Sequence, residues 1–335
     1  MSKVSVIVPV YKVENYIEKC VRSLFEQTME DIEVLFVDDS SPDNSVEIIE
    51  RLIEEYQTYL AKKKYVVRVI RMPSNSGQAV ARRRGILEAT GDYVIHCDSD
   101  DWVDIDLYEK MYKEAIISKS DIVICGYIYE YLGHADKREA LNVADKGKDV
   151  VRNWYRKCIF MSCCNKLVRR TLYIENTILP WEGLNMWEDN GLMTRLFYYA
   201  DRISVMRDSY YHYNRTNLGA VTNGYDQKSV RQMIGIAEYL TEFFESKSDA
   251  EDFRKTVMAF QFLAKINLIT DSFSRIKEYH TLFPESNAII SELDPRAFSA
   301  RGRLRFYMVK YHLAWLFVLM FKVRNWINSK STKAN

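Results

Sequence analysis

Three carboxylates follow a short apolar run in the segment Gly91–Asp101. The run Tyr93–Cys97 predicts a buried strand, and Asp98, Asp100 and Asp101 come directly after it. Carboxylates this close together repel one another, and a divalent cation such as Mg²⁺ or Mn²⁺ is the simplest partner for oxygen ligands of this kind. Ser and Asp are also ordinary turn residues, so this segment alone is equally compatible with a polar surface turn.

A second apolar run, Ile32–Val37, ends in the acidic pair Asp38 and Asp39. If both runs are parallel strands of one sheet, their acidic ends lie at the same edge. Open α/β folds bind their ligands at that edge. Two acidic strand ends therefore favour a ligand site over a turn.

Strand and helix patterns alternate over the first 130 residues. The predicted strands are Val4–Val8, Ile32–Val37, Tyr65–Ile70, Tyr93–Cys97 and Ile122–Tyr129, and the predicted helices span 13–25, 46–60, 78–89 and 105–117. This alternation predicts parallel βαβ units with right-handed crossovers, and hence an α/β fold.

The remaining chain is less regular at first and then helical. Residues 130–225 contain a polar loop or hairpin at 133–148, helical patterns at 151–160 and 192–199, and a short strand pattern at 203–206. Helical spacing dominates from about residue 226, with amphipathic patterns at 229–246 and 252–269. We expect a mixed domain over 1–225 and a C-terminal helical region over 226–335.

The segment from about 303 to 328 predicts an aromatic-rich last helix. Aromatic and aliphatic residues alternate there with Arg and Lys, and this tail has no acidic residue. Such a helix suits the surface of an anionic membrane. The alternative is a helix that packs on the protein's own core or on a dimer partner.

The composition is that of a protein with a packed core and no dominant charge. The 335 residues are 47% apolar with a net charge of +1, which gives no global field for nucleic acid. The six cysteines lack zinc-site spacing and are expected to be reduced thiols. Neither a signal peptide nor a stretch long enough to span a membrane is visible, so we expect a cytoplasmic protein, peripheral at most on the inner face of the membrane.

Several short motifs follow one another in a fixed order. They are Val6-Ile7-Val8-Pro9-Val10-Tyr11, Gln27-Thr28, Val37-Asp38-Asp39-Ser40-Ser41-Pro42-Asp43, Asn75-Ser76-Gly77, Ala81-Arg82 with Gly85, Gly91-Asp92-Tyr93 and Asp98-Ser99-Asp100-Asp101. Together they resemble glycosyltransferase family 2, the inverting enzymes with the GT-A fold. The resemblance continues thinly through Asn165-Lys166-Leu167, Trp187-Glu188-Asp189 and Tyr211-His212-Tyr213-Asn214-Arg215.

The resemblance implies a nucleotide-sugar donor held at the acidic sheet edge. The GT-A fold implied is a mostly parallel sheet, with 1–105 binding the donor and 106–225 carrying the acceptor side. The donor-binding residues implied are Pro9, Tyr11, Asp39, Arg82, Asp98 and Arg215. Asp39 would accept a hydrogen bond from a base N–H, which favours UDP. Asp100, with Asp98, would hold Mn²⁺ or Mg²⁺, and Asp101 has no assigned role.

Glu188 and Asp189 resemble the family's acidic pair that supplies the general base. Inversion needs one carboxylate to remove the proton of the acceptor hydroxyl, and we expect Asp189 to do so while Glu188 positions either Asp189 or the acceptor. An acidic pair also stabilises the start of a helix, which both residues can do at once. His212 is a further candidate metal ligand, although a single histidine is more often held by hydrogen bonds.

The sequence thus predicts an inverting, metal-dependent glycosyltransferase. The expected acceptor is a hydroxyl of a glycan or a lipid-linked glycan, in bacterial capsule, exopolysaccharide or lipopolysaccharide synthesis. The alternatives are a non-catalytic scaffold that binds sugar nucleotides and a nucleotidyltransferase. The second lacks support, because no Gly-rich loop follows the first strand.

Overall fold

The chain forms two compact units in the computed structural model. Residues 1–151 and 160–223 make up the first unit, and residues 152–159 and 224–335 the second. The structure describes residues 2–140, 142–157, 159–217, 219, 226–269, 273–295 and 300–331.

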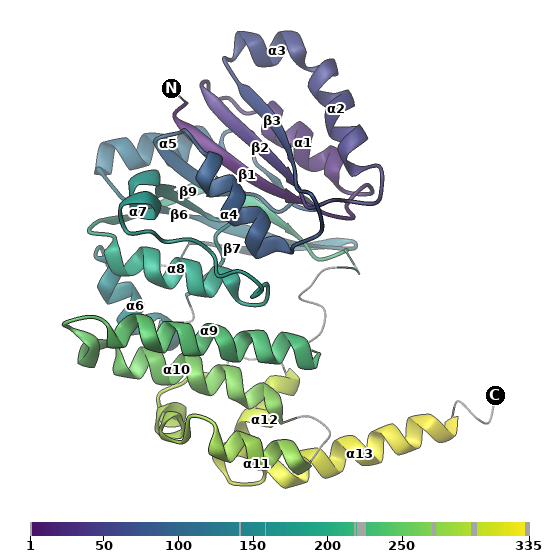
Figure 1. The fold of residues 1–335 in the computed structure, drawn as a ribbon, viewed down its shortest axis with the longest axis vertical. Helices are drawn as coiled ribbons and strands as arrows, with labels where there is room; N and C mark the ends of the chain where they lie inside the picture. The colour runs from purple at the N-terminus through teal and green to yellow at the C-terminus, as the bar shows by residue number, and fades with distance from the viewer. Residues whose placement is uncertain are drawn as a thin grey trace. The chain divides into compact units, whose positions relative to one another are not determined.

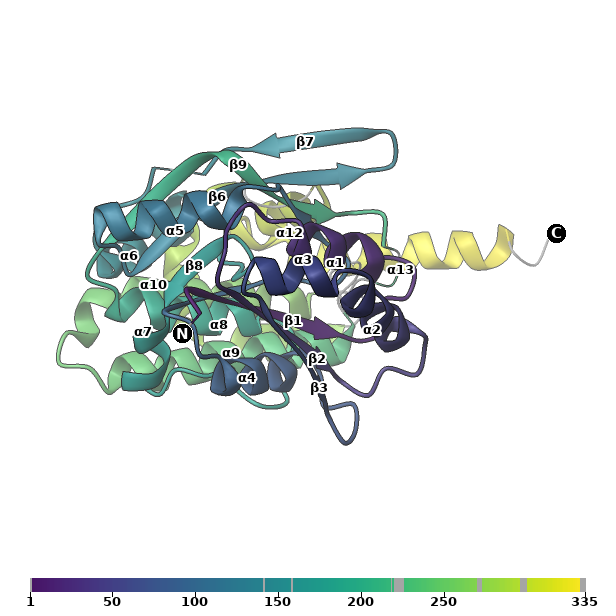
Figure 2. The same ribbon diagram turned by 90° about the horizontal axis from the view of Figure 1, so that it is seen from above.

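A nine-stranded sheet forms the centre of the first unit (Figure 1). Its strands are β1 (Val4–Val10), β2 (Ile32–Asp38), β3 (Val66–Arg71), β4 (Tyr93–His96), β5 (Trp102–Val103), β6 (Ile122–Tyr131), β7 (His134–Arg138), β8 (Lys166–Arg169) and β9 (Ile203–Asn214). Their order is β3-β2-β1-β4-β8-β6-β9-β5, and β7 pairs with β6 in a hairpin at the margin of the sheet (Figure 2).

Parallel pairing of β1 with β2 and β4 places the acidic strand ends together. β1 pairs in parallel with β2 and β4, with Val10 opposite Asp38 and Ile7 opposite His96. β2 pairs in parallel with β3, and β6 with β9, whereas β8 runs antiparallel to β4 and β6. The residues that follow β1, β2 and β4 therefore lie at one edge, and the predicted α/β fold with a mostly parallel sheet is confirmed.

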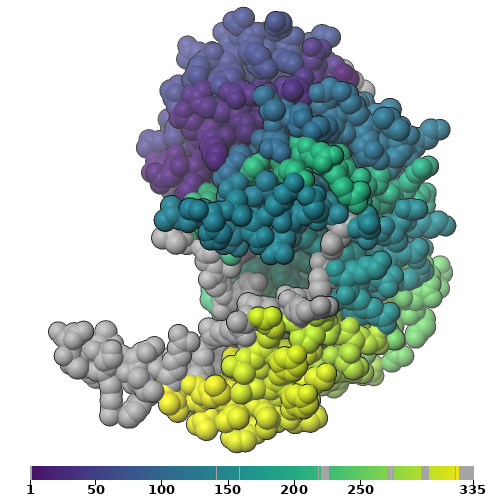
Figure 3. Space-filling view, turned by 180° about the vertical axis from the view of Figure 1, so that it is seen from behind, coloured from purple at the N-terminus to yellow at the C-terminus, as the bar shows by residue number. Residues whose placement is uncertain are grey.

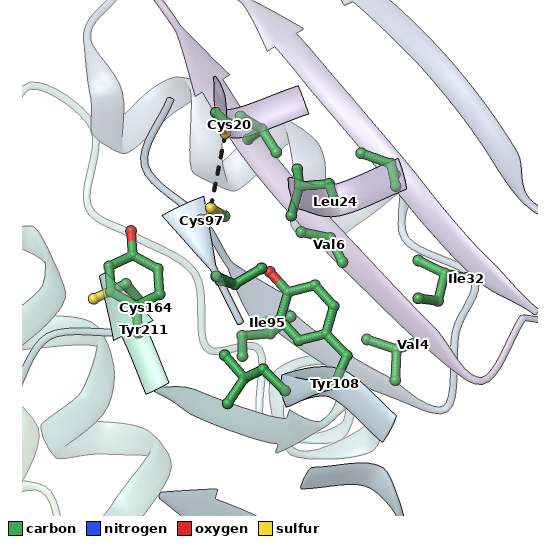
Figure 4. Close-up of a cluster of buried hydrophobic side chains, with 14 of the residues drawn as sticks. Val4, Val6, Cys20, Leu24, Ile32, Ile95, Cys97, Tyr108, Cys164 and Tyr211 are labelled. Carbon is green, nitrogen blue, oxygen red and sulfur yellow. Dashed lines mark hydrogen bonds between the residues drawn. The ribbon is translucent and has the colours of Figure 1, made fainter. Parts of the chain in front are cut away.

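Helices cover both faces of the sheet. The first unit contains α1 (Ile17–Phe25), α2 (Ser45–Glu55), α3 (Gln57–Lys62), α4 (Gln78–Glu88), α5 (Leu107–Ser118), α7 (Arg170–Glu175) and α8 (Glu188–Tyr199), and α6 (Gly147–Lys157) is divided between the units. The apolar faces of α1, α2 and α5 share one core with alternate side chains of β1, part of which Figure 4 shows. In that core the sulfur atoms of Cys20 and Cys97 lie 3.9 Å apart.

The opposite face of the sheet carries α4. Side chains alternate between the faces of a strand, so Ile7 of β1 points away from the core of α1 and α5. A Cβ at Gly85 of α4 would lie 2.4 Å from Ile7 Cγ2, so only glycine lets this helix approach β1 so closely. The close approach places α4 directly against β1, the strand that pairs with β4.

Two predictions for the first unit were too simple. The helix predicted over 46–60 is two helices, because the chain bends at Tyr56 between α2 and α3. The strand predicted over 203–206 continues to Asn214 as β9, with Asp208 at a φ of 70°. The polar segment after β6 forms the hairpin with β7, one of the two predicted alternatives.

The second unit is helical. It contains α9 (Gln227–Glu245), α10 (Arg254–Lys265), α11 (Phe273–Thr281), α12 (Ala300–Lys310) and α13 (Ala314–Ser331), with the short 3₁₀ helices η2 (Ala250–Phe253), η3 (Ile266–Leu268) and η4 (Pro284–Ser291). The presence of C-terminal helices confirms that part of the predicted fold. In the described ranges, no helix has both the length and the apolar character that crossing a membrane requires.

The prediction of one continuous last helix is wrong. The chain breaks between α12 and α13 at residues 311–313, where His312 has a φ of 60°. A left-handed residue cannot continue a right-handed helix, and it lets the N–H of Leu313 return to the carbonyl of Met308. The aromatic, basic tail is therefore two helices.

Candidate active site

A buried arginine joins two acidic groups that are far apart in the sequence. Arg82 of α4 is 2% exposed, and its guanidinium donates to Asp98 Oδ1 at 2.5 Å and to Glu188 Oε1. Asp98 follows β4, and Glu188 begins α8. The acidic strand end and the acidic pair therefore lie together at one edge of the sheet.

The loop before α4 is fixed by Asp39 and by an asparagine. The two carboxylate oxygens of Asp39 accept from the backbone N–H groups of Ser76 and Gly77, each at 2.7 Å. Asn185 Oδ1 accepts from the N–H of Ala79 at 3.0 Å, at the start of the helix. Gly77 has a φ of 90°, and a Cβ there would lie 2.3 Å from Asn185 Nδ2. Only glycine fits at this position, and it lets the N-terminal end of α4 pack against Asn185, in the segment that precedes Glu188.

Three of the residues predicted to bind the donor lie at the same sheet edge. Pro9 is buried in β1 opposite Val37, and Tyr11, two residues later, is 38% exposed with the Lys12 ammonium 5.3 Å from its ring centroid. Asp39 follows β2 and is buried. A carboxylate has about four acceptor sites, so two backbone N–H bonds leave Asp39 able to accept a third.

Asp101 forms hydrogen bonds with residues of β9 and so anchors the loop that follows β4. Its Oδ2 accepts the Tyr211 hydroxyl at 2.5 Å, and its Oδ1 accepts the N–H of Asn214 at 2.7 Å. The Tyr211 oxygen in turn accepts the N–H of Asp98 at 3.0 Å. Asp101 therefore ties the loop that carries Asp98 and Asp100 to β9.

Asp98 and Asp100 remain partly exposed, and their charges interact. Asp100 Oδ2 accepts from Asn217 Nδ2 at 2.7 Å, and Asp98 Oδ1 also accepts from Gln78 Nε2 at 3.2 Å. Burial, followed by the negative charge of Asp98, raises the pKa of Asp100. A nearby cation would relieve this repulsion.

The donor set fits a cation that is shared with a substrate. In the described part of the chain, no group of three or more His, Cys, Asp and Glu side chains is arranged to hold a metal ion. Two carboxylates of one loop can supply part of an oxygen shell, and Mg²⁺ in particular usually takes its other ligands from water and substrate phosphates. Asp98 and Asp100 are compatible with that arrangement.

The acidic pair at the start of α8 has two different environments. Glu188 is buried against Arg82, whereas Asp189 is partly exposed and its Oδ1 accepts from the N–H and the Nδ2 of Asn190 at 2.7 and 3.0 Å. Burial raises the pKa of Glu188 to about 8 against the opposing charge of Arg82, and desolvation raises the pKa of Asp189 in the same way. The more accessible carboxyl group is that of Asp189, and a raised pKa makes a carboxylate a stronger base.

His212 is bound on both sides by carboxylates. Its Nδ1 lies 2.7 Å from Glu130 Oε1, its Nε2 lies 2.9 Å from Asp104 Oδ1, and its ring stacks on Trp102 at 5.3 Å between centroids. Its ring nitrogens therefore bind carboxylates other than Asp98 and Asp100. This arrangement joins β9 to β6 and to the end of β5.

Arg215 lies just beyond β9 and is exposed. Its guanidinium carbon is 5.7 and 5.9 Å from the ring centroids of Tyr213 and Tyr129, and its N–H donates to the carbonyl of Glu130 at 2.8 Å. The following segment, from residue 218, falls largely outside the described residues. The structure thus brings Arg82, Asp98 and Glu188 into contact and leaves the Arg215 side chain on tyrosines.

Sequence reasoning gave no role to Asn185, Tyr211, Asn214 or Asn217. Tyr211, Asn214 and Asn217 contact Asp101 or Asp100, which the sequence singles out. Asn185 contacts the N–H of Ala79 at the start of α4. All four contacts form only through the tertiary fold. Tyr211 and Asn214 do lie in a motif of the family resemblance, which could have marked them. Asn185 carries no comparable signal, although it is three residues from Glu188.

The chain is similar to known glycosyltransferases of bacteria. Residues 5–176 match the model of glycosyl transferase family 2. The chain is 31% identical over 264 residues to the putative glycosyltransferase EpsH of Bacillus subtilis, covering 77% of this chain and 73% of that protein. It is 29% identical over 213 residues to the poly(ribitol-phosphate) beta-glucosyltransferase of Bacillus spizizenii, covering 63% of this chain and 32% of that protein.

A solved structure shares the fold. The S. aureus TarS fragment 1–349, in complex with UDP-GlcNAc, superposes with a TM-score of 0.68 at 18% sequence identity, covering 96% of this chain and 91% of that one. At this level of identity the similarity concerns the fold. It agrees with the GT-A architecture expected from the sequence.

Proposed function

Since the chain belongs to glycosyl transferase family 2, we propose that it is an inverting, metal-dependent glycosyltransferase with a UDP-sugar donor. Its membership of the family and its glycosyltransferase relatives make it a transferase enzyme. The observation that carries the proposal is the contact of Arg82 with both Asp98 and Glu188. Through it, the donor-side carboxylates and the acceptor-side acidic pair belong to one site.

Asp189 is the proposed general base. It removes the proton of the acceptor hydroxyl while that oxygen attacks the anomeric carbon, and the bond from that carbon to the diphosphate breaks on the opposite side. Glu188 positions Asp189 and is itself held by Arg82. The partial exposure and the raised pKa of Asp189 support this assignment.

The donor binds at the edge formed by β1, β2 and β4. Tyr11 stacks on the base beside Pro9, Asp39 accepts the base N–H, and Asp98 reaches the ribose hydroxyls. Arg82 keeps Asp98 in place, and Arg215 pairs with diphosphate oxygens, for which a guanidinium is well shaped. Support comes from the exposure of Tyr11 and from the position of Asp39 at the same edge.

Asp100, with Asp98, would hold Mn²⁺ or Mg²⁺. When bound, the cation neutralises charge that develops on the departing nucleotide. The raised pKa of Asp100 beside Asp98 supports this position.

The proposed acceptor is a glycan or a lipid-linked glycan in bacterial capsule, exopolysaccharide or lipopolysaccharide synthesis. One relative is named as a poly(ribitol-phosphate) beta-glucosyltransferase, and the solved TarS fragment is in complex with UDP-GlcNAc. The proposed location is the cytoplasm, with peripheral contact at the inner face of the membrane. The basic and aromatic tail supports that contact.

Thermal stability with a panel of nucleotide sugars tests the donor assignment. We expect UDP-sugars to stabilise the protein in the presence of Mn²⁺ and to do so less with a chelator, by mass action of about 2.7 kcal/mol at a ligand concentration one hundred times Kd. CDP-sugars are the matched control, because cytosine lacks the ring N–H that Asp39 would accept. Stabilisation by GDP-sugars alone, or by none of the panel, would contradict the proposal.

A further inference from the structure

The last two helices of the second unit expose many large apolar side chains. They are Leu304, Tyr307, Tyr311, Leu313, Trp315, Leu319, Met320 and Val323. Tyr311 is 64% exposed and Trp315 is 51% exposed. An exposed apolar patch of this kind marks a surface that contacts another body. Figure 3 shows the described part of this segment (yellow).

The other sides of the same helices are already packed. Phe306 and Val309 of α12, and Phe317 and Val318 of α13, are buried, and the Phe306 ring meets Phe262 of α10 at 6.4 Å between centroids. The helices therefore dock on their own unit through one side. The exposed side chains are not needed for that docking.

The exposed side of α12 combines apolar and basic residues. At 3.6 residues per turn, Arg303, Leu304, Tyr307, Lys310 and Tyr311 share an arc of about 120°. All five are exposed, and the rings of Tyr307 and Tyr311 stack at 6.5 Å between centroids. Tyrosines beside two cations can enter a lipid headgroup layer while the cations stay in water.

α13 repeats the arrangement after the break. Trp315, Leu319, Lys322 and Val323 are exposed and share an arc of about 100°. The Lys322 ammonium lies 4.7 Å from the ring centroid of Phe273 in α11, which is itself 47% exposed. We call the exposed sides of α12 and α13, with residues 311–313, the tail surface.

The charge of the tail surface distinguishes between possible occupants. From Pro295 to Asn335 the sequence contains no Asp or Glu. A second copy bound to the same surface by a twofold axis would bring like charges together, which disfavours that contact. An anionic lipid surface complements both the cations and the apolar side chains.

We propose that the tail surface binds anionic phospholipid, with Tyr307, Tyr311 and Trp315 in the headgroup layer and Arg303, Lys310 and Lys322 facing lipid phosphates. This inference rests on the peripheral membrane contact of the proposed function and names the surface and the lipid chemistry behind it, but it is independent of the transfer reaction, because vesicle binding requires neither donor nor acceptor. Its failure would leave the proposed donor chemistry untouched. Failure of the donor assignment would likewise leave lipid binding untouched.

Flotation of the full chain with vesicles tests the proposal. We expect the protein to float with vesicles of phosphatidylcholine containing about one-third phosphatidylglycerol at low salt, and to be released at high salt. Lys310→Glu should weaken this binding by about fivefold or more, the effect of roughly one cation near such a surface. Trp315→Ala should weaken it also for phosphatidylcholine alone.

Matched variants on α9 are the controls. Lys228→Glu and Tyr239→Ala change exposed residues of the same types in the same unit and should leave flotation unchanged. Circular dichroism and thermal unfolding check that every variant is folded. No flotation of the wild type at low salt, or equal loss in the α9 controls, overturns the proposal. Self-association of the wild type that Trp315→Ala abolishes, without flotation, assigns the surface to a second copy instead.

Discussion

Arg82 Nη2 lies 2.5 Å from Asp98 Oδ1, and the other end of the same guanidinium holds Glu188. The three side chains come from α4, the end of β4 and the start of α8. A guanidinium can bind two carboxylates at once because its donors form a fixed planar fork. Arg82 therefore fixes the loop that carries Asp98 relative to the start of α8.

Replacing Arg82 tests that connection. Arg82→Met leaves two carboxylates without their cation, one of them buried, and should lower the free energy of unfolding by about 3–5 kcal/mol. Arg82→Lys keeps the charge but loses the planar fork of donors. We therefore expect it to restore part of the stability lost in Arg82→Met but much less of the transfer activity. Urea unfolding and release of UDP measure the two effects.

Arg84→Met is the matched control for Arg82. Arg84 lies on the same helix, is half-exposed, and pairs with Glu88 one turn later, a contact of about 0.5 kcal/mol or less. If Arg82→Met unfolds at the same urea concentration as Arg84→Met, the guanidinium does not hold the site together.

Asp189→Asn should remove transfer and keep nucleotide binding. An amide cannot take the proton of the acceptor hydroxyl, and general base catalysis contributes about 10²- to 10⁴-fold to the rate. In the wild type, transfer should increase with pH through the raised pKa of Asp189, because only the ionised carboxylate is a base. The variant should lose that dependence.

Glu182→Gln serves as the control for Asp189. Glu182 is exposed, lies in the same approach to α8, and pairs only at the surface with Arg83. Its replacement should leave the rate within about twofold, as expected for a pair worth under about 0.5 kcal/mol. Turnover by Asp189→Asn at the wild-type rate would exclude Asp189 as the base.

Much of the first unit could be predicted because its signals are local. The apolar run Val4–Val8 and the acidic residues after β2 and β4 each indicate a structural requirement within a few residues. Parallel pairing then brings the strand ends to one edge without further information. The resemblance implies that Arg82 and Asp98 both belong to the donor-binding residues, and their contact is compatible with that prediction.

Other features depend on tertiary contacts that no local pattern records. Between Ile124 and Gly126 the register of β6 with β9 shifts, with Val205 opposite the first and Tyr210 opposite the second. The polar residues in this irregular stretch interrupt the apolar pattern, so the sequence does not reveal the second half of β9. Tyr211 lies in that second half, where its hydroxyl contacts Asp101. The break at His312 could not be predicted either, because residues 311–313 include no glycine or proline.

Asp100→Asn tests the cation site. Removing one of two charged oxygen ligands should lower the affinity for UDP-sugar when Mn²⁺ is present and have little effect in a chelator. Isothermal titration in both conditions measures the difference. Asp92→Asn is the control: it changes an exposed carboxylate at the other end of β4 and should behave as wild type. Equal donor affinity with and without chelator in the wild type would argue against the cation.

The buried ammonium of Lys166 predicts an unusual alkaline dependence. Lys166 Nζ donates to the carbonyls of Phe160 and Ser162 and to Asn165 Oδ1, and burial lowers its pKa to about 8. Because the unfolded chain holds this proton up to a pKa of about 10.4, the unfolded state binds more protons between pH 8 and 10. Lys166 therefore makes the folded state gain stability as pH rises through that window, by up to about 3 kcal/mol.

Lys166→Met isolates this contribution. The variant loses the three hydrogen bonds at every pH, but it also loses the titration, so the stability advantage of the wild type should grow between pH 7.5 and 10. Lys265, whose pKa burial also lowers to about 8, titrates equally in both proteins and cancels in the difference. Lys62→Met, at an exposed position of α3, should show no such growth in urea unfolding. A difference that stays constant with pH would mean that Lys166 keeps an ordinary proton affinity in the fold.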